Sequence, residues 1–289
     1  MNIETTRGAI RNYIDSALAD SNERDSKVLE AARYMALNDF GGLYRPLLLL
    51  ATAKGYSVGI DKAMPIGTAI EFVHVASLIE DDIMDNSDTR RGKMACHTKF
   101  GESVAHLAHM YLREAAEEQI TLKNSLSNPQ RIDIARKAFR TGKSMVYGQE
   151  RDVLQRDIDS VDKVVRMYAQ KTGALIGAAL VCGGIVGRAC EEDVCSLDMM
   201  GINAGVAYQI IDDALDERSS VETGKPANQD SAKQTLLKIV GWEGVKKLKS
   251  ECDAEVDRLL ATLHGDPCFL GDLIHHLRHK HDNYVNVSP

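Results

Sequence analysis

Apolar residues recur at steps of three and four along most of this chain. The segments "VVRMYAQKTGALIGAALVCGGIVG" and "KIVGWEGVKKLKSECDAEVDRLLATL" keep this spacing over their whole length. Such spacing places the apolar side chains on one face of a helix. Runs that alternate apolar and polar residues between hairpin turns, which would indicate strands, are missing. The pattern predicts an all-α fold with about ten helices of ordinary length.

Glycine, proline and short polar residues interrupt the helical pattern, and each interruption is a predicted connection. They lie near Gly55-Tyr56, Asn86-Gly92, Asn124-Pro129, Ser219-Asn228 and Gly265-Pro267. No internal repeat or low-complexity linker divides the chain, and its 289 residues suit one large domain. We therefore expect a single domain over residues 1–289.

Composition narrows the class of protein. Hydrophobic residues make up 44% of the chain, enough for a core, and charged residues make up 27%. The formal net charge of −7 argues against a general nucleic-acid binder, which usually carries a basic face. No apolar stretch is expected to be long enough to span a membrane, and the N-terminal residues lack the apolar core of a signal peptide. We expect a cytoplasmic protein.

Cysteine usage agrees with that compartment. The cysteines are scattered along the chain without a Cys-x-x-Cys pair, at Cys96, Cys182, Cys190, Cys195, Cys252 and Cys268. In a chain of this length they indicate reduced thiols rather than a disulfide framework or a zinc site.

Carboxylates gather at the end of one apolar segment, "ASLIEDDIMDNSDTRRGK". If this segment is helical, Asp81, Asp82 and Asp85 lie within one arc, where like charges repel and weaken the helix. A hard divalent cation such as Mg²⁺ prefers oxygen ligands and would neutralise them. A solvated acidic helix end is the alternative interpretation.

A second segment, "YQIIDDALDER", repeats the Asp-Asp-x-x-Asp spacing with Asp212, Asp213 and Asp216. It also follows an apolar helical run. Two such carboxylate clusters facing each other across a cavity would bind several Mg²⁺ ions and one strongly anionic ligand between them. The repetition favours a metal–diphosphate site over two solvated helix ends.

The motifs "GGLYRP", "EFVHVASLIEDDIMDNSDTRRG", "GQERD", "KTGA", "YQIIDDALD" and "GKP" follow one another in this order. In this respect the chain resembles the trans-isoprenyl diphosphate synthases, the polyprenyl synthetases that include farnesyl and geranylgeranyl diphosphate synthases. The resemblance extends from about Gly41 to the C-terminal helix. It implies a single-domain helical bundle around a central cavity and a homodimer. It also implies condensation of an allylic diphosphate with isopentenyl diphosphate into a longer all-trans prenyl diphosphate.

The resemblance also implies roles for individual residues. The implied ligands of three Mg²⁺ ions are Asp81, Asp85, Asp152, Asp212 and Asp216. The implied catalytic residues are Asp81, Asp82, Asp85, Lys171, Asp212 and Asp213. The implied contacts of the allylic diphosphate are Arg90, Gln149, Lys171, Thr172, Gln209 and Lys225. Together the metal and the cations would stabilise charge on the leaving diphosphate, so that the allylic carbon–oxygen bond ionises.

The site for isopentenyl diphosphate departs from the family's pattern. Arg45, His74 and Arg91 match expected contacts, but Gly42 stands where relatives carry a lysine and Leu43 where they carry an arginine. Losing one charge-assisted contact costs on the order of 1.5–3 kcal/mol, roughly ten- to a hundredfold in affinity. Two alternatives therefore stay open. One is a terpene synthase-like enzyme that ionises an allylic diphosphate without isopentenyl diphosphate. The other is a non-catalytic subunit of a heteromeric synthase, although such subunits usually lose an Asp-rich motif and both are present here.

The resemblance also implies that the residues just before the first Asp-rich motif help to set the product length. Ala76 and Ser77 occupy the fifth and fourth positions before Asp81, and both are small. A bulky side chain there would block growth of the prenyl chain. We therefore expect a product of fifteen or twenty carbons.

Overall fold

The computed structural model describes residues 2–19, 23, 25–38, 41–155, 158–216 and 234–285, and the side chains up to residue 278. Its elements are α1 (Ile3–Ala17), α2 (Lys27–Ala36), α3 (Tyr44–Gly55), α4 (Ile60–Met84), β1 (Thr89–Arg90), β2 (Lys93–Met94), α5 (Cys96–Phe100), α6 (Glu102–Thr121), α7 (Asn128–Leu154), α8 (Val161–Tyr168), η1 (Ala169–Gly173), α9 (Ala174–Gly187), α10 (Glu191–Asp216), α12 (Leu236–Leu260) and α13 (Cys268–Val285). The predicted all-α class is confirmed. Its small exception is the antiparallel pairing of β1 with β2, which the hydrophobic pattern did not indicate.

Local sequence determines where these helices begin. At the start of α7, Ser127 and Gln130 form a capping box, with Pro129 in the first turn. The side chains of Asn2, Ser26 and Thr235 likewise cap α1, α2 and α12 by accepting hydrogen bonds from exposed backbone N–H groups. The predicted connections at residues 55–56, 86–92, 124–129 and 265–267 are confirmed. The one at Ser219-Asn228 lies outside the described residues.

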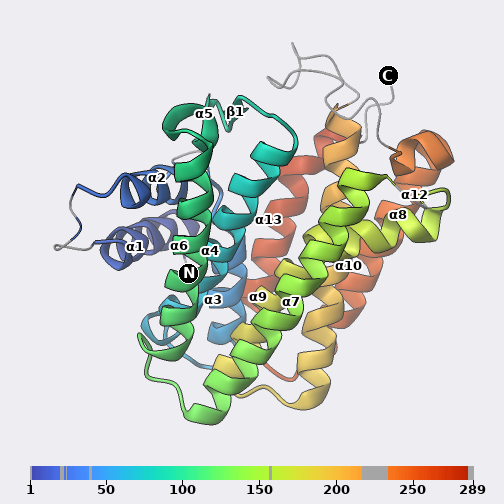
Figure 1. Ribbon diagram of the computed structural model, residues 1–289. Helices are drawn as coiled ribbons and strands as arrows, with labels where there is room; N and C mark the ends of the chain where they lie inside the picture. The colour runs from blue at the N-terminus through green and yellow to red at the C-terminus, as the bar shows by residue number, and fades with distance from the viewer. Residues whose placement is uncertain are drawn as a thin grey trace.

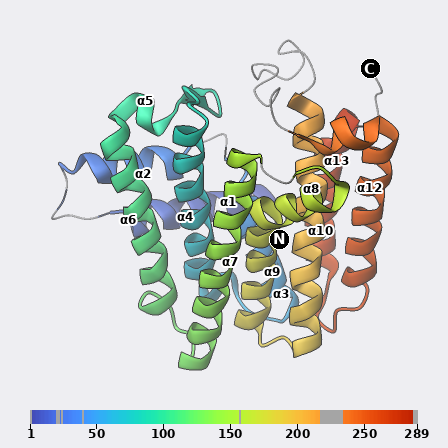
Figure 2. The ribbon, with the colours of Figure 1, turned by 45° about the vertical axis from the view of Figure 1, so that its right-hand side comes forward.

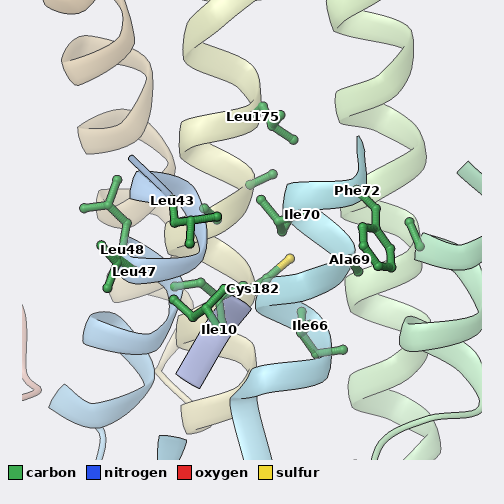
Figure 3. Packing of buried hydrophobic residues seen from close by; sticks show 14 of the residues in the cluster. Ile10, Leu43, Leu47, Leu48, Ile66, Ala69, Ile70, Phe72, Leu175 and Cys182 are labelled. Atoms are coloured by element: carbon green, nitrogen blue, oxygen red, sulfur yellow. The ribbon is translucent and has the colours of Figure 1, made fainter. Parts of the chain in front are cut away.

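The main core forms where α3, α4 and α9 pack together, with α1 against them (Figure 3). Leu47 of α3, Phe72 of α4 and Cys182 of α9 are completely buried there. Helix α4 is buried on several sides, which explains why its apolar residues do not form a single stripe. At about 25 cal/mol per Å² of apolar surface, such burial is the main stabilising contribution to the fold.

Two helix contacts bring backbones unusually close. A Cβ atom on Gly205 of α10 would lie 2.3 Å from the Gly173 Cα, and one on Gly201 would lie 2.3 Å from the Gly177 Cα. Real Cβ atoms do not approach other atoms so closely, so only glycine fits at these positions. Helix α10 therefore packs with its backbone against η1 and α9.

The same requirement holds where α7 packs on η1. A Cβ on Gly148 would lie 2.3 Å from the backbone nitrogen of Lys171. The segment η1 is a π-helical turn, a feature that is rare and frequently found at functional sites. These contacts fix the position of Lys171 relative to the end of α7.

The C-terminal ends of α4, α7 and α10 lie toward the same, upper end of the molecule in both ribbon views (Figures 1 and 2). Both Asp-rich motifs belong to these ends, and "GQERD" lies in the last turns of α7. Residues about 130 positions apart in the sequence are thereby brought to one region, as the sequence analysis required for a shared site.

The expectation that no apolar stretch could span a membrane is wrong by length and composition. The segments Ile60–Met84, Val161–Gly187 and Glu191–Leu215 are long and apolar enough. Within their most apolar windows, 78%, 67% and 44% of the residues are buried inside the protein. Most of the first two windows therefore belongs to the interior of the helical bundle, and composition alone does not separate such a use from a span.

Candidate active site

The first Asp-rich motif occupies the last turn of α4. Asp82 is completely buried, and its Oδ1 accepts a hydrogen bond of 2.6 Å from Nε of Arg90 in the β1–β2 hairpin. The same guanidinium lies 3.3 Å from Asp81. Asp85 is the exposed C-cap residue of α4. The structure therefore pairs Arg90 with the first two carboxylates of the motif.

Lys171 connects this motif with α7. Its Nζ lies 2.5 Å from Asp152 Oδ2 and 3.3 Å from Asp81 Oδ1. Gln149, one turn before Asp152, donates a hydrogen bond of 2.9 Å to the same Asp81 oxygen. The residues that the sequence analysis assigned to "GQERD" and "KTGA" thus converge on Asp81.

Charge at this cluster follows from its surroundings. Burial acts to raise the pKa of Asp81, but Lys171 and Arg90 outweigh it and hold this pKa below its usual value. Burial dominates at Asp82 and raises its pKa, although Arg90 acts in the other direction. Asp81 is therefore a carboxylate at neutral pH and the stronger candidate for binding a cation.

The second Asp-rich motif contacts the "KTGA" segment from the opposite side. Asp213 is buried and accepts hydrogen bonds from the Tyr168 hydroxyl and from Gln209 Nε2. Gln209 in turn accepts a hydrogen bond of 2.9 Å from the Thr172 hydroxyl. Asp212 acts electrostatically on Arg90, whose pKa it helps to raise. The segment 168–172 thus connects the two motifs.

Sequence reasoning missed Tyr168. Its hydroxyl also accepts a long backbone hydrogen bond of 3.4 Å from Leu236 at the start of α12. Burial, followed by Asp213, raises the pKa of Tyr168, so the phenol remains protonated and donates to that carboxylate. Its position three residues before Lys171 was the only available signal, because the partner lies 45 residues later.

Two assigned residues are outside this description. Lys225 lies outside the described residues, and Asp216 is the last residue of α10, without a described side chain. Their assignments as a diphosphate contact and a metal ligand stay predictions.

The donor chemistry of the two clusters fits Mg²⁺. Their possible ligands are carboxylate oxygens, which this hard cation prefers. Asp82 Oδ2 is buried and accepts no hydrogen bond from the part of the chain that the structure describes. A buried acceptor in this position is consistent with a cationic or hydrogen-bonding ligand nearby.

A second cationic cluster surrounds His74. Its Nε2 lies 3.0 Å from an Arg45 terminal nitrogen and 3.3 Å from one of Arg91. Both guanidiniums are donors only, so this nitrogen accepts and the imidazole proton belongs on Nδ1. Glu71, one turn earlier on α4, is buried, and burial raises its pKa although Arg45 and Arg91 lie near. Among the described groups, Arg45 Nε and Glu71 Oε2 are buried without a hydrogen-bond partner.

The "GGLYRP" loop, which lacks the family's lysine, is contacted by an arginine of α1. A Cβ on Gly42 would lie 2.3 Å from the Tyr44 ring, so this ring occupies the space where a side chain would begin. Arg7 of α1 reaches the same point, where its Nε donates a 3.1 Å hydrogen bond to the Gly42 carbonyl oxygen. Its guanidinium lies 5.4 Å from the centre of the Tyr44 ring. An arginine from elsewhere in the chain therefore stands beside this loop, which sequence spacing could not reveal.

Replacing His74 is expected to change how stability depends on pH. Burial, with Arg45 and Arg91, lowers the pKa of His74 well below its usual value, so the folded protein keeps it neutral. The unfolded histidine binds a proton near pH 6.5, and wild-type stability is lost as the pH falls through that value. The limiting slope of this contribution is about 1.4 kcal/mol per pH unit. His74→Gln keeps an acceptor without titrating, so urea unfolding between about pH 7.5 and 5.5 should show a smaller slope.

The matched variant His106→Gln should change the slope in the opposite direction. The hydrogen bond that His106 donates to the Glu80 carboxylate raises the pKa of His106, so its protonation stabilises the folded protein at acid pH. Identical slopes for wild type and His74→Gln would contradict the assigned protonation state of His74.

The predicted chain-length residues lie on α4, where Ala76 is buried and Ser77 is partly buried. Ala76 is completely buried, and its carbonyl oxygen lies 3.0 Å from Nδ1 of His109 on α6. Ser77 donates a hydrogen bond of 2.8 Å to the carbonyl oxygen of His74. Ala76 therefore lies at the contact between α4 and α6.

Comparisons with known proteins agree with these features. The polyprenyl synthetase family model matches residues 26–259. A farnesyl diphosphate synthase of Micrococcus luteus is 34% identical over 261 residues, covering 87% of this chain and 89% of the relative. Geranylgeranyl pyrophosphate synthase 7 of Arabidopsis thaliana is 35% identical over 268 residues, covering 89% and 74%. A solved FPP/GFPP synthase from Zymomonas mobilis has a TM-score of 0.83 at 27% identity, covering 95% and 96%. The chain belongs to the polyprenyl synthetase family.

Proposed function

We propose that this chain is a trans-prenyltransferase that condenses an allylic diphosphate with isopentenyl diphosphate, giving a longer all-trans prenyl diphosphate and free diphosphate. The observation that carries the proposal is the network joining the two Asp-rich motifs. Lys171 contacts Asp81 of the first motif, and the adjacent Thr172 contacts Gln209 beside Asp213 of the second. Relatives named as farnesyl and geranylgeranyl diphosphate synthases support chain elongation as the reaction class.

The residues divide the work by charge. Arg90 and Lys171 would contact the allylic diphosphate and stabilise the charge that develops on it as the carbon–oxygen bond breaks. Gln149, Thr172 and Gln209 would orient these groups through their hydrogen bonds. Apolar helix faces keep water from the allylic cation. The π-bond of isopentenyl diphosphate then attacks this cation, and the released diphosphate takes up the proton.

We propose that the cofactor is Mg²⁺ and that three ions bind. Asp81, Asp85 and Asp152 would hold two of them, and Asp212 with Asp216 the third. When bound, the metal supplies Lewis-acid stabilisation of the diphosphate leaving group. The buried Asp82 would support the first group through its bond to Arg90.

Isopentenyl diphosphate would bind beside the cationic cluster of Arg45, His74 and Arg91, with Arg7 in the role of the absent lysine. Arg7→Ala should then raise the KM for isopentenyl diphosphate about tenfold, because one charge-assisted contact is lost. The KM for the allylic substrate should stay within twofold. Steady-state kinetics with each substrate varied in turn measures both constants.

A matched control is Arg136→Ala, which removes an exposed arginine of α7 paired with Asp133. It should change neither KM. Equal effects of Arg7→Ala on both substrates would contradict the assigned role of Arg7.

Gly42 also keeps the terpene synthase-like alternative open, since this loop lacks the family's lysine. The deciding experiment incubates the protein with Mg²⁺ and geranyl or farnesyl diphosphate, with and without isopentenyl diphosphate, and identifies the products by mass spectrometry. A longer diphosphate that forms only with isopentenyl diphosphate supports the proposal. A hydrocarbon or alcohol from the allylic substrate alone overturns it. No product under either condition would favour a non-catalytic subunit.

Product length should respond to Ala76. The Ala76→Phe variant places a large ring in a completely buried position next to α6, where it should block the growing chain. We expect the main product to become at least one five-carbon unit shorter, as measured by chromatography of the dephosphorylated alcohols. The matched variant Ala115→Phe, on the same pair of helices but only partly buried, should leave the distribution unchanged. An unaltered distribution in Ala76→Phe would show that this residue does not limit chain growth.

We further propose a homodimer in the cytoplasm. Large apolar side chains are exposed on α6 and α7 at Leu107, Met110, Phe139, Val146 and Tyr147. A second copy of the chain would bury this face, and exposed apolar patches commonly mark such interfaces. Light scattering of the purified protein measures the mass, and a monomer at micromolar concentration would contradict the assembly.

A further inference from the structure

A second cluster of metal-binding side chains lies far from the Asp-rich motifs. Cys190 precedes α10, Asp193 lies in its first turn, and His264 lies in the connection from α12 to α13. One possible ligand atom from each lies within 4.8 Å of the other two. Asp193 lies in the first turn of α10 and Asp213 in its last turn. About 30 Å along the helix therefore separates this cluster from the second Asp-rich motif.

The separations approach those required by one tetrahedral zinc ion. With Zn–S of about 2.3 Å and Zn–N of about 2.0–2.1 Å, the sulfur and nitrogen ligands of such an ion lie about 3.6 Å apart. Cys190 Sγ and His264 Nδ1 are 3.6 Å apart. His264 Nδ1 is 2.9 Å from Asp193 Oδ1, against about 3.4 Å for two zinc ligands, so a small movement of the exposed ring suffices.

The carboxylate at the centre of this cluster is held in place from several sides. Asp193 is only 1% exposed and accepts a 2.6 Å hydrogen bond from the hydroxyl of Tyr56, at the end of α3. The backbone N–H of His264 lies 3.2 Å from both of its oxygens. Outer hydrogen bonds of this kind orient metal-ligating carboxylates. Three protein ligands leave a fourth tetrahedral position for solvent.

We propose that Cys190, Asp193 and His264 form a site for Zn²⁺ or a similar borderline-soft divalent cation, distinct from the site for Mg²⁺. A thiol and an imidazole favour zinc, whereas Mg²⁺ prefers oxygen ligands. On binding, Cys190 releases its proton to solvent. His264 also gives up the Nδ1 proton that it now shares with Asp193, so that the neutral ring carries its proton on Nε2. The bound ion would join the connection between α12 and α13 to the start of α10. The sequence analysis found no zinc motif because 74 residues separate Cys190 from His264.

Cobalt is the probe that tests this site, because a thiolate ligand gives Co²⁺ a charge-transfer absorption band. The full-length protein, freed of transition metals and kept in excess Mg²⁺, is titrated with Co²⁺ by absorption and with Zn²⁺ by calorimetry. We expect one equivalent to bind and the thiolate band to appear. Cys190→Ser should abolish the band, and His264→Gln should weaken Zn²⁺ binding at least tenfold.

The matched control is Cys195→Ser, which removes another exposed cysteine of α10 outside the cluster and should leave band and affinity unchanged. Circular dichroism of each variant verifies the fold. Absence of the band in the wild-type protein would overturn the proposal, as would an equal band in Cys190→Ser. None of these experiments measures prenyl transfer, so their outcome is independent of the proposed function.

Discussion

Asp81→Asn is expected to lower kcat about a thousandfold, because one neutralised group at the charge-stabilising centre commonly costs a factor of this size. Asp81 is the carboxylate on which Lys171, Gln149 and Arg90 converge. Asparagine has nearly the same shape but no charge, so it binds a divalent cation poorly. The concentration of Mg²⁺ needed for half-maximal activity should therefore also rise. Initial rates over a Mg²⁺ titration measure both effects.

Folding should be little affected by this change. Lys171 keeps its contact with Asp152, and Arg90 keeps its bond to the buried Asp82. The matched control is Asp88→Asn, an exposed acid just beyond the motif, whose backbone oxygen accepts a hydrogen bond from Ala95. It should keep wild-type rates. Near-normal turnover by Asp81→Asn at saturating Mg²⁺ would remove Asp81 from the metal site.

Lys171→Ala should lower both activity and stability. Its ammonium group contacts Asp152, which is only 6% exposed, and removing one member of a buried ion pair costs on the order of 3 kcal/mol. Loss of a cationic contact to the diphosphate should lower kcat about a hundredfold. Urea unfolding and single-turnover rates measure the two effects separately.

A double variant tests the structural role of Lys171. Adding Asp152→Asn removes the carboxylate that Lys171 neutralised, so the double variant should recover part of the stability without recovering activity. Lys137→Ala is the matched control. Lys137 of α7 lies 2.6 Å from Asp198 of α10, in an ion pair that also joins two elements. It should lower stability but not kcat. The effect of Lys171 on activity is read from the single variant, because Asp152 is itself an assigned metal ligand. Equal stability of the single and double variants would show that the ion pair with Asp152 does not stabilise the fold.

The fold could be predicted from the sequence where the signal is local. Apolar spacing identified the helices, and glycine, proline and short polar residues identified the breaks at Gly55-Tyr56 and Asn124-Pro129. The hairpin that carries Arg90 was missed because each strand has only two residues, too few for an alternating pattern. No membrane-length segment was expected from the sequence, yet three helices are long and apolar enough when mean hydropathy is taken over a window that tolerates a few charged residues.

The site could be predicted where the motifs carry it and was missed where contacts are distant. The resemblance placed Lys171, Gln149 and Thr172 around the Asp-rich motifs. In the structure Lys171 and Gln149 both contact Asp81, and Thr172 contacts Gln209. Arg7 is 35 residues from Gly42, and no periodic pattern connects two such positions. Tyr168 was missed for the same reason. Residues that meet only through packing have no signature in a single sequence.

The glycine contacts between α10 and the η1–α9 segment have a consequence for how such a protein can diversify. Backbone lies directly on backbone at Gly173 and Gly205, so the distance of α10, which carries the second Asp-rich motif, from the η1 segment does not depend on the size of any side chain there. Ala76 lies elsewhere, at the contact between α4 and α6. Substitutions that reshape the space for a hydrocarbon chain can accumulate at that contact while the diphosphate chemistry keeps its dimensions. In this architecture the range of product lengths can therefore change while the reaction mechanism stays the same.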